Sequence, residues 1–571
     1  MKRFLILLFI LLLIPTAMAA NVDDLLSITL LSASQTENDT LIGGTAELHL
    51  QLRPGHGAIF IESYPLSKLD TQAATRLANE IACEFTTENC NDYDFFYTIR
   101  ADSSVIGGPS AGGATALLTL AALEDIELKD SIAMTGAISS GGIITSVGSV
   151  KEKLIAAELT NHDLAIVPLL SFSENASDNY TITFDDVKDL TIDIRPVLTL
   201  EEALAIASTK ELVFPSTEFV VEEQYKNQMK ITSQILCDRA SELESELTTE
   251  QMNDSIYDLV TNFLNKSRIA FANEDYYARA SFCYSTNINL RELLVKELSL
   301  EVKLENKKRL ETSIDSLETT IDARKLNVFS DLETYFIVKE RLLEAQLYMD
   351  EINDSNVSSR LLALAIERYY SSVAWSEFFD LPGDPLIIDD ASLRLAALQE
   401  FQQVESRLSY LRLYLPDYFL EGTEEQLDQA KVYFRNEQYA LALFKATKSR
   451  ASANSYLSTI SLTTENAEPL VWAKLNRAKE VIASQDPFPI LGYSYYEYAS
   501  NLVESDTSTA LLYSEYALAF SDLDNYFSPA KKLIILSSLQ AVDFYMFFAG
   551  LALGLVILVL RESFIKRHTK K

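Results

Sequence analysis

Two hydrophobic periods alternate along the first two hundred residues. In some short runs, apolar and polar residues alternate, which is typical of half-buried strands. In others, apolar residues recur every three or four positions, as on one face of a helix. Strands are predicted at 46–52, 58–63, 164–168 and 190–194, and helices at 71–84, 114–123 and 200–208. We therefore expect a mixed α and β domain over residues 21–209.

A different pattern begins near residue 217. No glycine occurs between Gly148 and Gly383, and no proline between Pro215 and Pro382. Only long helices tolerate such a stretch, because these two residues punctuate turns. A coiled-coil-like spacing is formed by Leu310, Ile314, Leu317 and Ile321. We expect an all-α domain over residues 217–540, built as an antiparallel helical array.

An aromatic–small–small pattern recurs within this helical region, at 275–282, 367–375, 437–444 and 510–519. It resembles degenerate tetratricopeptide-like hairpins, in which small residues let helices pack closely. The spacing between the segments is irregular. A second interpretation therefore stays open, in which they are core stripes of an irregular helical domain.

Both ends of the chain carry membrane-related signals. Residues 1–19 combine a basic start, a short apolar run and a small-residue cleavage pattern, as in a signal peptide. Residues 541–560 form an apolar run long enough to cross a bilayer, and the tail 561–571 is basic. We expect a single-pass type I protein of the cell membrane, with residues 21–540 on the extracytoplasmic side. An uncleaved N-terminal anchor and a buried C-terminal core helix are the alternatives.

Charge and motifs narrow the classes of partner. The chain has 82 acidic and 48 basic side chains, for a net charge of −34, which argues against a nucleic-acid partner. No metal-ligand cluster stands out, and no G-x-x-x-x-G-K-[ST] nucleotide loop occurs. We expect neither a metal nor another cofactor.

The four cysteines suit an exported protein. Cys83 and Cys90 lie at the end of a predicted helix and in the next loop, so a disulfide would close a short loop. We expect Cys237 and Cys283 to join two helices of the array.

The candidate chemistry lies in a glycine-rich turn, Gly108-Pro-Ser-Ala-Gly112, that precedes a predicted helix. The turn places Ser110 where a loop enters a helix, with free backbone N–H groups around it. The N–H groups of Gly108 and Ser110 are candidates for holding an oxyanion. The turn also fits the nucleophile elbow of α/β-hydrolases, but that fold needs a histidine well downstream of the serine.

Histidine is a poor candidate for the base that Ser110 requires. The chain has only four: His49, His56, His162 and His568. Lysine is the better candidate, because the segment 148–158 opens a helix from a glycine turn and carries Lys153 in its first turns. Burial and the positive end of the helix dipole would both disfavour its ammonium form.

Three segments in order resemble the proteolytic domain of the Lon proteases: 108–112, 133–136 and 148–157. This resemblance implies that Ser110 is the nucleophile and Lys153 the general base, with Thr135 as a supporting hydroxyl that hydrogen-bonds the lysine. Lys151 is then an exposed neighbour. The resemblance implies an α+β fold that is shared with the GHMP small-molecule kinases, whose own phosphate-binding motif fits this sequence poorly.

Two positions depart from the Lon pattern. The family usually has an acidic residue three positions before the serine, where this chain has Gly107, and a glutamate two positions after the threonine, where it has Ala137. In the family these acids help to orient or gate the dyad. Their replacement bears on resting activity and regulation.

Two hypotheses for function follow. In the first, the chain is an ATP-independent serine endopeptidase, anchored in the membrane, that cleaves flexible or misfolded segments of exported or membrane proteins. In the second, the protease-like domain is inert and the chain is a membrane-tethered helical binding or scaffold protein. Because Lon-type domains generally work as rings, we expect the helical domain either to assemble a homo-oligomer or to roof the active site.

Overall fold

The computed structural model describes residues 25–35, 40–101, 106–173, 180–212, 214, 219–352, 355, 357–460 and 467–529. The predicted signal peptide (1–19), membrane span (541–560) and basic tail (561–571) lie outside these residues. Within the described ranges, no helix combines the length and apolar character that a membrane span needs.

A mixed seven-stranded sheet organises the N-terminal domain, in the order β3-β4-β2-β1-β5-β8-β9. Its strands are β1 (Leu26–Gln35), β2 (Leu41–Pro54), β3 (Ile59–Tyr64), β4 (Tyr93–Ala101), β5 (Ile132–Met134), β8 (Leu164–Pro168) and β9 (Asp193–Val197). The pairs β1–β2 and β2–β4 are antiparallel, and the other neighbouring pairs are parallel. A separate hairpin pairs β6 (Ala137–Ser139) with β7 (Ile143–Thr145).

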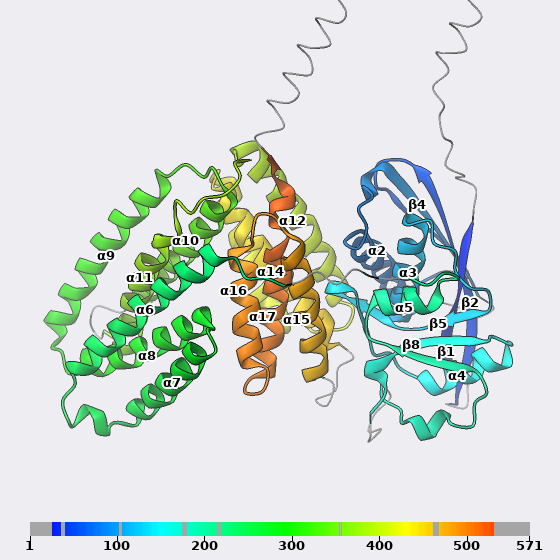
Figure 1. Cartoon of the computed structure of the whole chain (residues 1–571), viewed down its shortest axis with the longest axis horizontal. Helices are drawn as coiled ribbons and strands as arrows, with labels where there is room; N and C mark the ends of the chain where they lie inside the picture. The colour runs from blue at the N-terminus through cyan, green and yellow to red at the C-terminus, as the bar shows by residue number, and fades with distance from the viewer. Residues whose placement is uncertain are drawn as a thin grey trace, which may run out of the picture.

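Helices cover both faces of this sheet (Figure 1). The helices α2 (Leu69–Cys83), α3 (Gly112–Leu123) and α5 (Leu200–Ala207) share one hydrophobic core with the sheet. On the other face, α4 (Val150–Leu159) packs Val150, Leu154 and Ala157 against Leu31 and Ala133. Because α3 and α4 lie on opposite faces, the residues that begin the two helices meet beyond the end of β5, where Gly136 N–H donates to the Ser110 carbonyl.

Most predicted elements of this domain are confirmed, with boundaries shifted by a few residues. One strand is misplaced, because the run predicted at 190–194 forms a strand only from Asp193 onward. Its register explains the shift, since β9 begins to pair with β8 where Asp193 faces Leu164. Both expected disulfides are present: Cys83–Cys90, and Cys237–Cys283 between α6 (Glu223–Ser245) and α8 (Tyr276–Lys296).

The C-terminal domain is a helical array, as predicted. Besides α6 and α8, its helices are α7 (Ser255–Ala272), α9 (Leu300–Asp322), α10 (Phe329–Asp350), α11 (Ser359–Trp375), α12 (Asp390–Leu411), α13 (Glu421–Arg435), α14 (Tyr439–Thr459), α15 (Ala467–Ser484), α16 (Ile490–Leu502) and α17 (Thr507–Ser521). Each aromatic–small–small segment falls in the second helix of a packed consecutive pair: α7–α8, α10–α11, α13–α14 and α16–α17.

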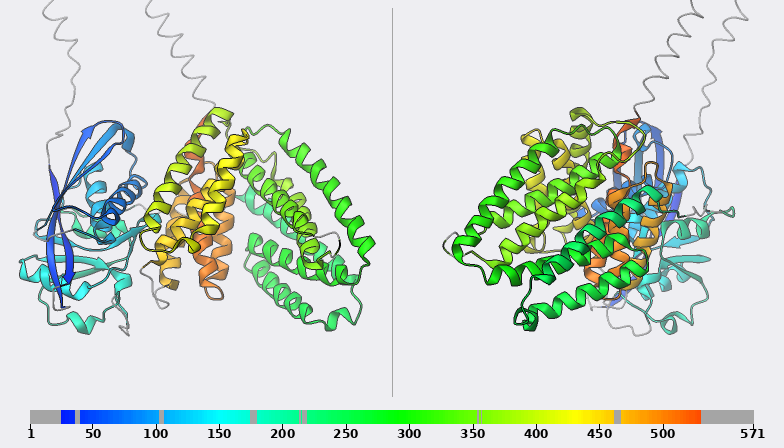
Figure 2. Two further views of the ribbon diagram at one scale, coloured as in Figure 1. Left: turned by 180° about the vertical axis from the view of Figure 1, so that it is seen from behind. Right: turned by 60° about the vertical axis from the view of Figure 1, so that its left-hand side comes forward.

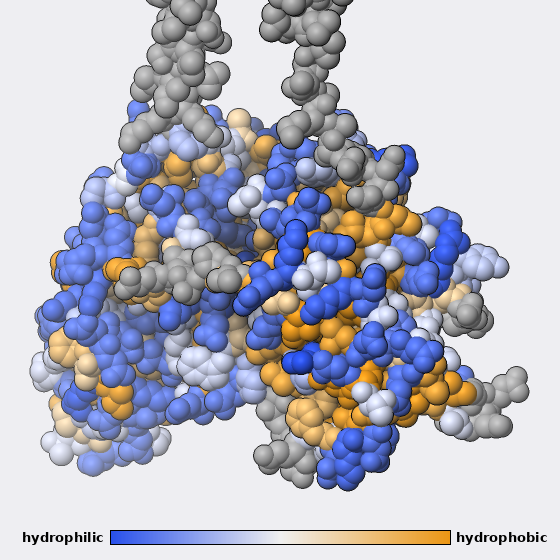
Figure 3. Space-filling view, turned by 45° about the vertical axis from the view of Figure 1, so that its right-hand side comes forward, coloured by the Kyte–Doolittle hydropathy of each residue, from blue (hydrophilic) through white to orange (hydrophobic). Residues whose placement is uncertain are grey.

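The array has two lobes. A first lobe, α6–α11, lies away from the sheet domain, and a second lobe, α12–α17, lies against it (Figures 1 and 2). One hydrophobic core runs through both lobes. In the space-filling view the helical array is mostly hydrophilic, whereas hydrophobic side chains gather on the sheet domain (Figure 3).

Candidate active site

Ser110 lies on a short turn that enters α3. Gly108 has φ 100° and ψ 159°, a conformation that favours glycine, and a single 3₁₀ turn, Pro109–Ala111, connects it to the helix. The turn is tied to the end of β5 by two backbone hydrogen bonds. Gly136 N–H donates to the Ser110 carbonyl over 3.0 Å, and Gly113 N–H donates to the Gly136 carbonyl over 2.9 Å. These two hydrogen bonds fix the position of the serine relative to the residues that follow β5.

Lys153 approaches the same place from the opposite face of the sheet. It lies in the first turns of α4 and is only 4% exposed. Its Nζ donates a hydrogen bond to Oγ1 of Thr135, which is fully buried, over 3.2 Å. Burial lowers the pKa of Lys153 from 10.5 to about 8. The amine is therefore close to the range in which a lysine can act as a general base at neutral pH.

Ser110 and Lys153 line one cavity of about 360 Å³. Ser110 Oγ and Lys153 Nζ are not directly hydrogen-bonded to each other in this structure. By contrast, Lys151 on the same helix has a 46% exposed side chain and lies 3.6 Å from Asp186 Oδ1. The structure thus separates the two lysines into one facing the cavity and one facing solvent, which agrees with the sequence-based expectation.

The turn before Ser110 is held by a residue that sequence reasoning missed. Gly108 N–H donates to Asp70 Oδ2 over 3.0 Å, and Thr71 Oγ1 donates to the Gly108 carbonyl over 3.3 Å. Gly108 was expected to offer its N–H to an oxyanion, but Asp70 occupies that group. Among the described residues, nothing accepts the Ser110 N–H, which stays available.

Asp70 also bears on the missing acid at Gly107. The Asp70 carboxylate comes from the first turn of α2, 37 residues before Gly107 in the chain. It accepts the hydrogen bond of Gly108, the residue next to Gly107. A Cβ on Gly107 would lie 2.7 Å from Lys68 Cδ, so the α2 entry closely borders this position. Negative charge beside the nucleophile turn is thus supplied from another element.

The helical domain completes the cavity. It is also lined by residues about 300 positions after Ser110 and Lys153 in the chain: Tyr410, Tyr414, Leu457 and Ile460. Tyr410 is buried and belongs to the hydrophobic core of the sheet domain. Nothing in the local sequence marks these residues, because only the packing of α12 and α14 on the sheet domain brings them there.

Two polar anchors fix this packing. Arg407 on α12 donates to both carboxylate oxygens of Glu80 on α2, over 2.8 and 3.3 Å. On the other anchor, Lys474 Nζ lies 2.7 Å from Glu515 Oε1, and both side chains are completely buried. This pair holds Ser140, because the Ser140 hydroxyl donates to Glu515 over 2.7 Å and Lys474 donates to the Ser140 carbonyl over 3.0 Å. Ser140 follows the β6 strand that begins at Ala137.

Comparison with known proteins identifies the N-terminal domain. Residues 72–210 match the sequence model of the Lon protease C-terminal proteolytic domain. The chain contains a Lon-type proteolytic domain. The match covers Ser110, Thr135 and Lys153.

Several curated Lon proteases are similar over this domain. An archaeal Lon protease of Halobacterium salinarum is 29% identical over 141 residues, which is 24% of this chain and 19% of that protein. The Lon proteases of Escherichia coli K12 and Erwinia amylovora are 35% and 36% identical over 104 and 100 residues, 18% of this chain and 12% of each. The chain therefore spans about an eighth to a fifth of the length of these relatives, and the similarity concerns the Lon-type domain alone.

Proposed function

We propose that this chain is a serine endopeptidase in which Ser110 and Lys153 form the catalytic dyad. The observation that carries the proposal is the burial of Lys153, which lowers its pKa to about 8 in the same cavity that Ser110 lines. A lysine at a solvated helix start would be almost entirely protonated at neutral pH and could not accept a proton. The Lon-type domain supports the same reaction class.

In the proposed reaction, the neutral Lys153 amine removes the proton of the Ser110 hydroxyl, and Oγ attacks the carbonyl carbon of the scissile bond. The carbonyl oxygen takes the negative charge and is held by the Ser110 N–H. The Lys153 ammonium then gives its proton to the departing amine, which leaves an ester on Ser110. A water molecule, deprotonated by the same lysine, hydrolyses that ester and restores the serine.

Thr135 would orient the base in this scheme. Its hydroxyl is the hydrogen-bond partner of Lys153 Nζ, and its position at the end of β5 is fixed because its N–H donates to the Ile166 carbonyl over 3.1 Å. The hydroxyl accepts a hydrogen bond from the ammonium form and can donate one to the neutral amine. It can therefore hold Nζ in place through both halves of the reaction.

The substrates that we propose are flexible or misfolded segments of exported or membrane proteins. The cavity holds about 360 Å³ and is roofed by the helical domain, which favours an extended chain over a folded surface. We further propose an ATP-independent reaction, because the 571 residues contain no G-x-x-x-x-G-K-[ST] loop. Residues 541–560 would anchor the protein in the membrane, with the catalytic domain outside the cytoplasm. Assembly into a homo-oligomer is a further part of the proposal.

The experiment compares full-length protein with Ser110→Ala on unfolded casein, without added nucleotide. Ser171→Ala serves as the matched control, because Ser171 is a fully buried serine outside the cavity whose hydroxyl has no partner among the described residues. Internal cleavage by the wild type and by Ser171→Ala, but not by Ser110→Ala, is expected. Cleavage by none of the three proteins, or the same background cleavage by all three, would favour the inert helical scaffold instead.

A further inference from the structure

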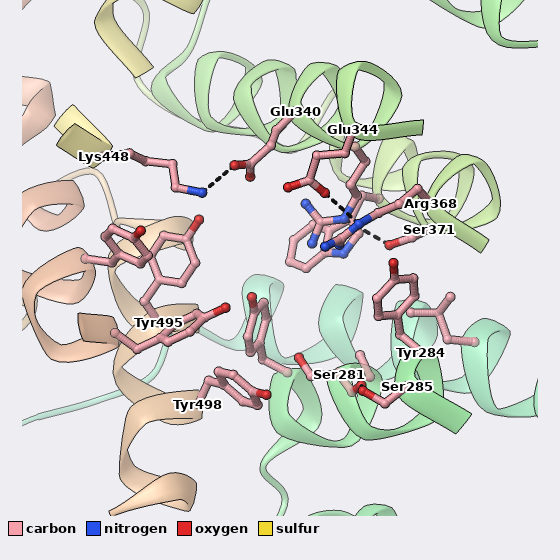
Figure 4. A pocket seen from close by; sticks show the side chains of 17 residues that line it. Ser281, Tyr284, Ser285, Glu340, Glu344, Arg368, Ser371, Lys448, Tyr495 and Tyr498 are labelled. Carbon is pink, nitrogen blue, oxygen red and sulfur yellow. Dashed lines mark hydrogen bonds and ion pairs between the residues drawn. The ribbon is translucent and has the colours of Figure 1, made fainter. Parts of the chain in front are cut away.

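A second cavity, of about 250 Å³, lies inside the helical domain (Figure 4). It opens at the seam between the two lobes, with walls from α8, α10 and α11 on one side and from α14, α16 and α17 on the other. It shares no lining residue with the active-site cavity. Its walls combine aromatic rings with charged groups, which is unusual for a gap between packed helices.

The charges of this cavity do not cancel. Glu340 pairs with Lys448, and Glu344 Oε2 lies 2.6 Å from Arg368 Nε. Arg341 is the remaining charged group, and among the described residues no carboxylate lies within ion-pair distance of it. It donates instead to the Ser371 hydroxyl over 2.9 Å and to the Ile337 carbonyl over 3.2 Å. In a chain with a net charge of −34, this cavity carries an excess positive charge.

The positive charges around the cavity act on the carboxyl group of Glu340. Burial by itself would raise the pKa of the Glu340 carboxyl, but Lys448, Lys445 and Arg341 outweigh burial and lower it to about 2. Glu340 therefore stays ionised and is already matched. The Arg341 guanidinium retains unused N–H groups, and a fork of such groups suits a planar oxyanion.

Tyrosine hydroxyls around the cavity also lack partners. Tyr284 Oη is buried and has no hydrogen-bond partner in the described part of the chain. The hydroxyls of Tyr495 and Tyr498 likewise make no hydrogen bond to any described residue. Figure 4 shows Tyr495 and Tyr498 reaching in from one side and Tyr284 from the other, below Arg368 and Ser371. A buried hydroxyl without a partner is costly, so a ligand that accepts hydrogen bonds would stabilise the Tyr284 hydroxyl, and the Tyr495 and Tyr498 hydroxyls are further donors.

We propose that this cavity binds a small organic carboxylate, with Arg341 as its anchor. The guanidinium and the tyrosine hydroxyls supply donors to the carboxylate oxygens, and the rings of Tyr277, Trp375 and Tyr495 offer an apolar wall for an organic body. The volume falls below the roughly 300–1,000 Å³ of sites for drug-sized ligands. The ligand is therefore about the size of one amino acid or a dipeptide, and its carboxylate belongs to a free small molecule or to a peptide C-terminus.

The test measures binding to the full-length chain carrying Ser110→Ala, so that no peptide is cleaved and the result does not depend on the proposed protease activity. The probes are benzoate, acetyl-Ala-Phe with a free carboxylate, and the same peptide with a C-terminal amide. Isothermal titration should show saturable binding of at least one carboxylate and none of the amide. Comparable binding of benzoate and the peptide acid identifies a free carboxylate as sufficient, whereas binding of the peptide acid alone identifies a chain terminus.

Two variants locate the site. Arg341→Gln should weaken carboxylate binding at least about tenfold, because a charge-assisted hydrogen-bonded contact is lost. Tyr284→Phe should weaken it about threefold without lowering the thermal unfolding temperature, because the hydroxyl has no protein partner to lose. Arg435→Gln, at an exposed arginine that ends α13, is the matched control and should bind as the parent does.

Several results would overturn the proposal. These are no binding of either carboxylate at millimolar concentration by the folded protein, equal binding of peptide acid and amide, or unchanged affinity in both Arg341→Gln and Tyr284→Phe. Displacement of the carboxylate by inorganic phosphate at lower concentration would also reject the ligand class. If Arg341→Gln fails to fold, the Tyr284→Phe comparison decides.

Discussion

The depressed pKa of Lys153 predicts both an activity profile and a stability profile, and one substitution tests the two together. A lowering from 10.5 to about 8 leaves about a tenth of the lysine neutral at pH 7, about a hundredth at pH 6 and half at pH 8. Peptide cleavage should therefore rise nearly tenfold from pH 6 to pH 7 and level off above about pH 9. A fluorogenic peptide assay at constant ionic strength would record this curve.

The same lowering destabilises the fold when the lysine is charged. It corresponds to about 2.5 pH units at about 1.36 kcal/mol each, or about 3.4 kcal/mol of unfolding free energy at neutral pH. The unfolded chain binds more protons than the folded chain between pH 8 and pH 10.5, so stability should rise with pH across this window. By pH 10 the penalty falls to about 1 kcal/mol.

Lys153→Met removes the penalty together with the activity. The unfolding free energy of the variant, relative to that of wild type, should be about 2.5 kcal/mol higher at pH 7 than at pH 10. This change with pH does not depend on the lost hydrogen bond to Thr135. Lys151→Met is the matched control on the same helix, because its side chain is exposed and should affect neither curve. Urea unfolding at both pH values supplies the free energies. A rate profile with its midpoint near pH 10.5, or a stability difference that does not change with pH, would refute the reasoning.

Three further substitutions test the surroundings of the dyad. Asp70→Ala removes the acceptor of the Gly108 N–H, so kcat should fall about tenfold with little change in KM, and kinetics with a short peptide would detect it. Ala137→Glu places a carboxylate in the cavity, which should raise the pKa of Lys153 and move the midpoint of the pH–rate curve up by about one unit or more; an unmoved midpoint would show that this position does not reach the amine. Lys474→Met leaves Glu515 buried without its partner and should cost about 3–5 kcal/mol of stability, whereas the double variant Lys474→Met/Glu515→Leu should recover most of the loss in a thermal unfolding comparison.

The sequence predicts the local parts of this protein well. Ser110 was expected at a glycine turn and Lys153 at a helix start, and both residues lie there; the helical array follows from a long stretch without glycine or proline. Burial, one of the two effects expected to lower the pKa of Lys153, lowers it to about 8. The depth of that burial depends on how α4 lies on the sheet, which local sequence cannot specify.

Long-range contacts explain the rest. Asp70 reaches Gly108 because α2 and the nucleophile turn lie side by side, and Tyr410 reaches the cavity because α12 packs on α2. Such contacts join residues that are tens to hundreds of positions apart, and each side chain is unremarkable in its own segment. The strand predicted at 190–194 was misplaced for the same kind of reason, because its register is set by pairing with β8.

The two anchors between the domains bear on the role of the helical array. The sequence left two roles open, assembly of several copies or a roof over the active site. In this structure Tyr410 and Tyr414 line the cavity of their own chain. Lys474 and Glu515 hydrogen-bond Ser140, which lies three residues after Ala137 of the cavity wall. A roof held by a fully buried ion pair cannot swing away without exposing or separating those charges, which is costly. In the proposed endopeptidase, substrate would therefore enter beneath a roof that stays in place, and a segment that is already extended would meet this condition without an unfolding step.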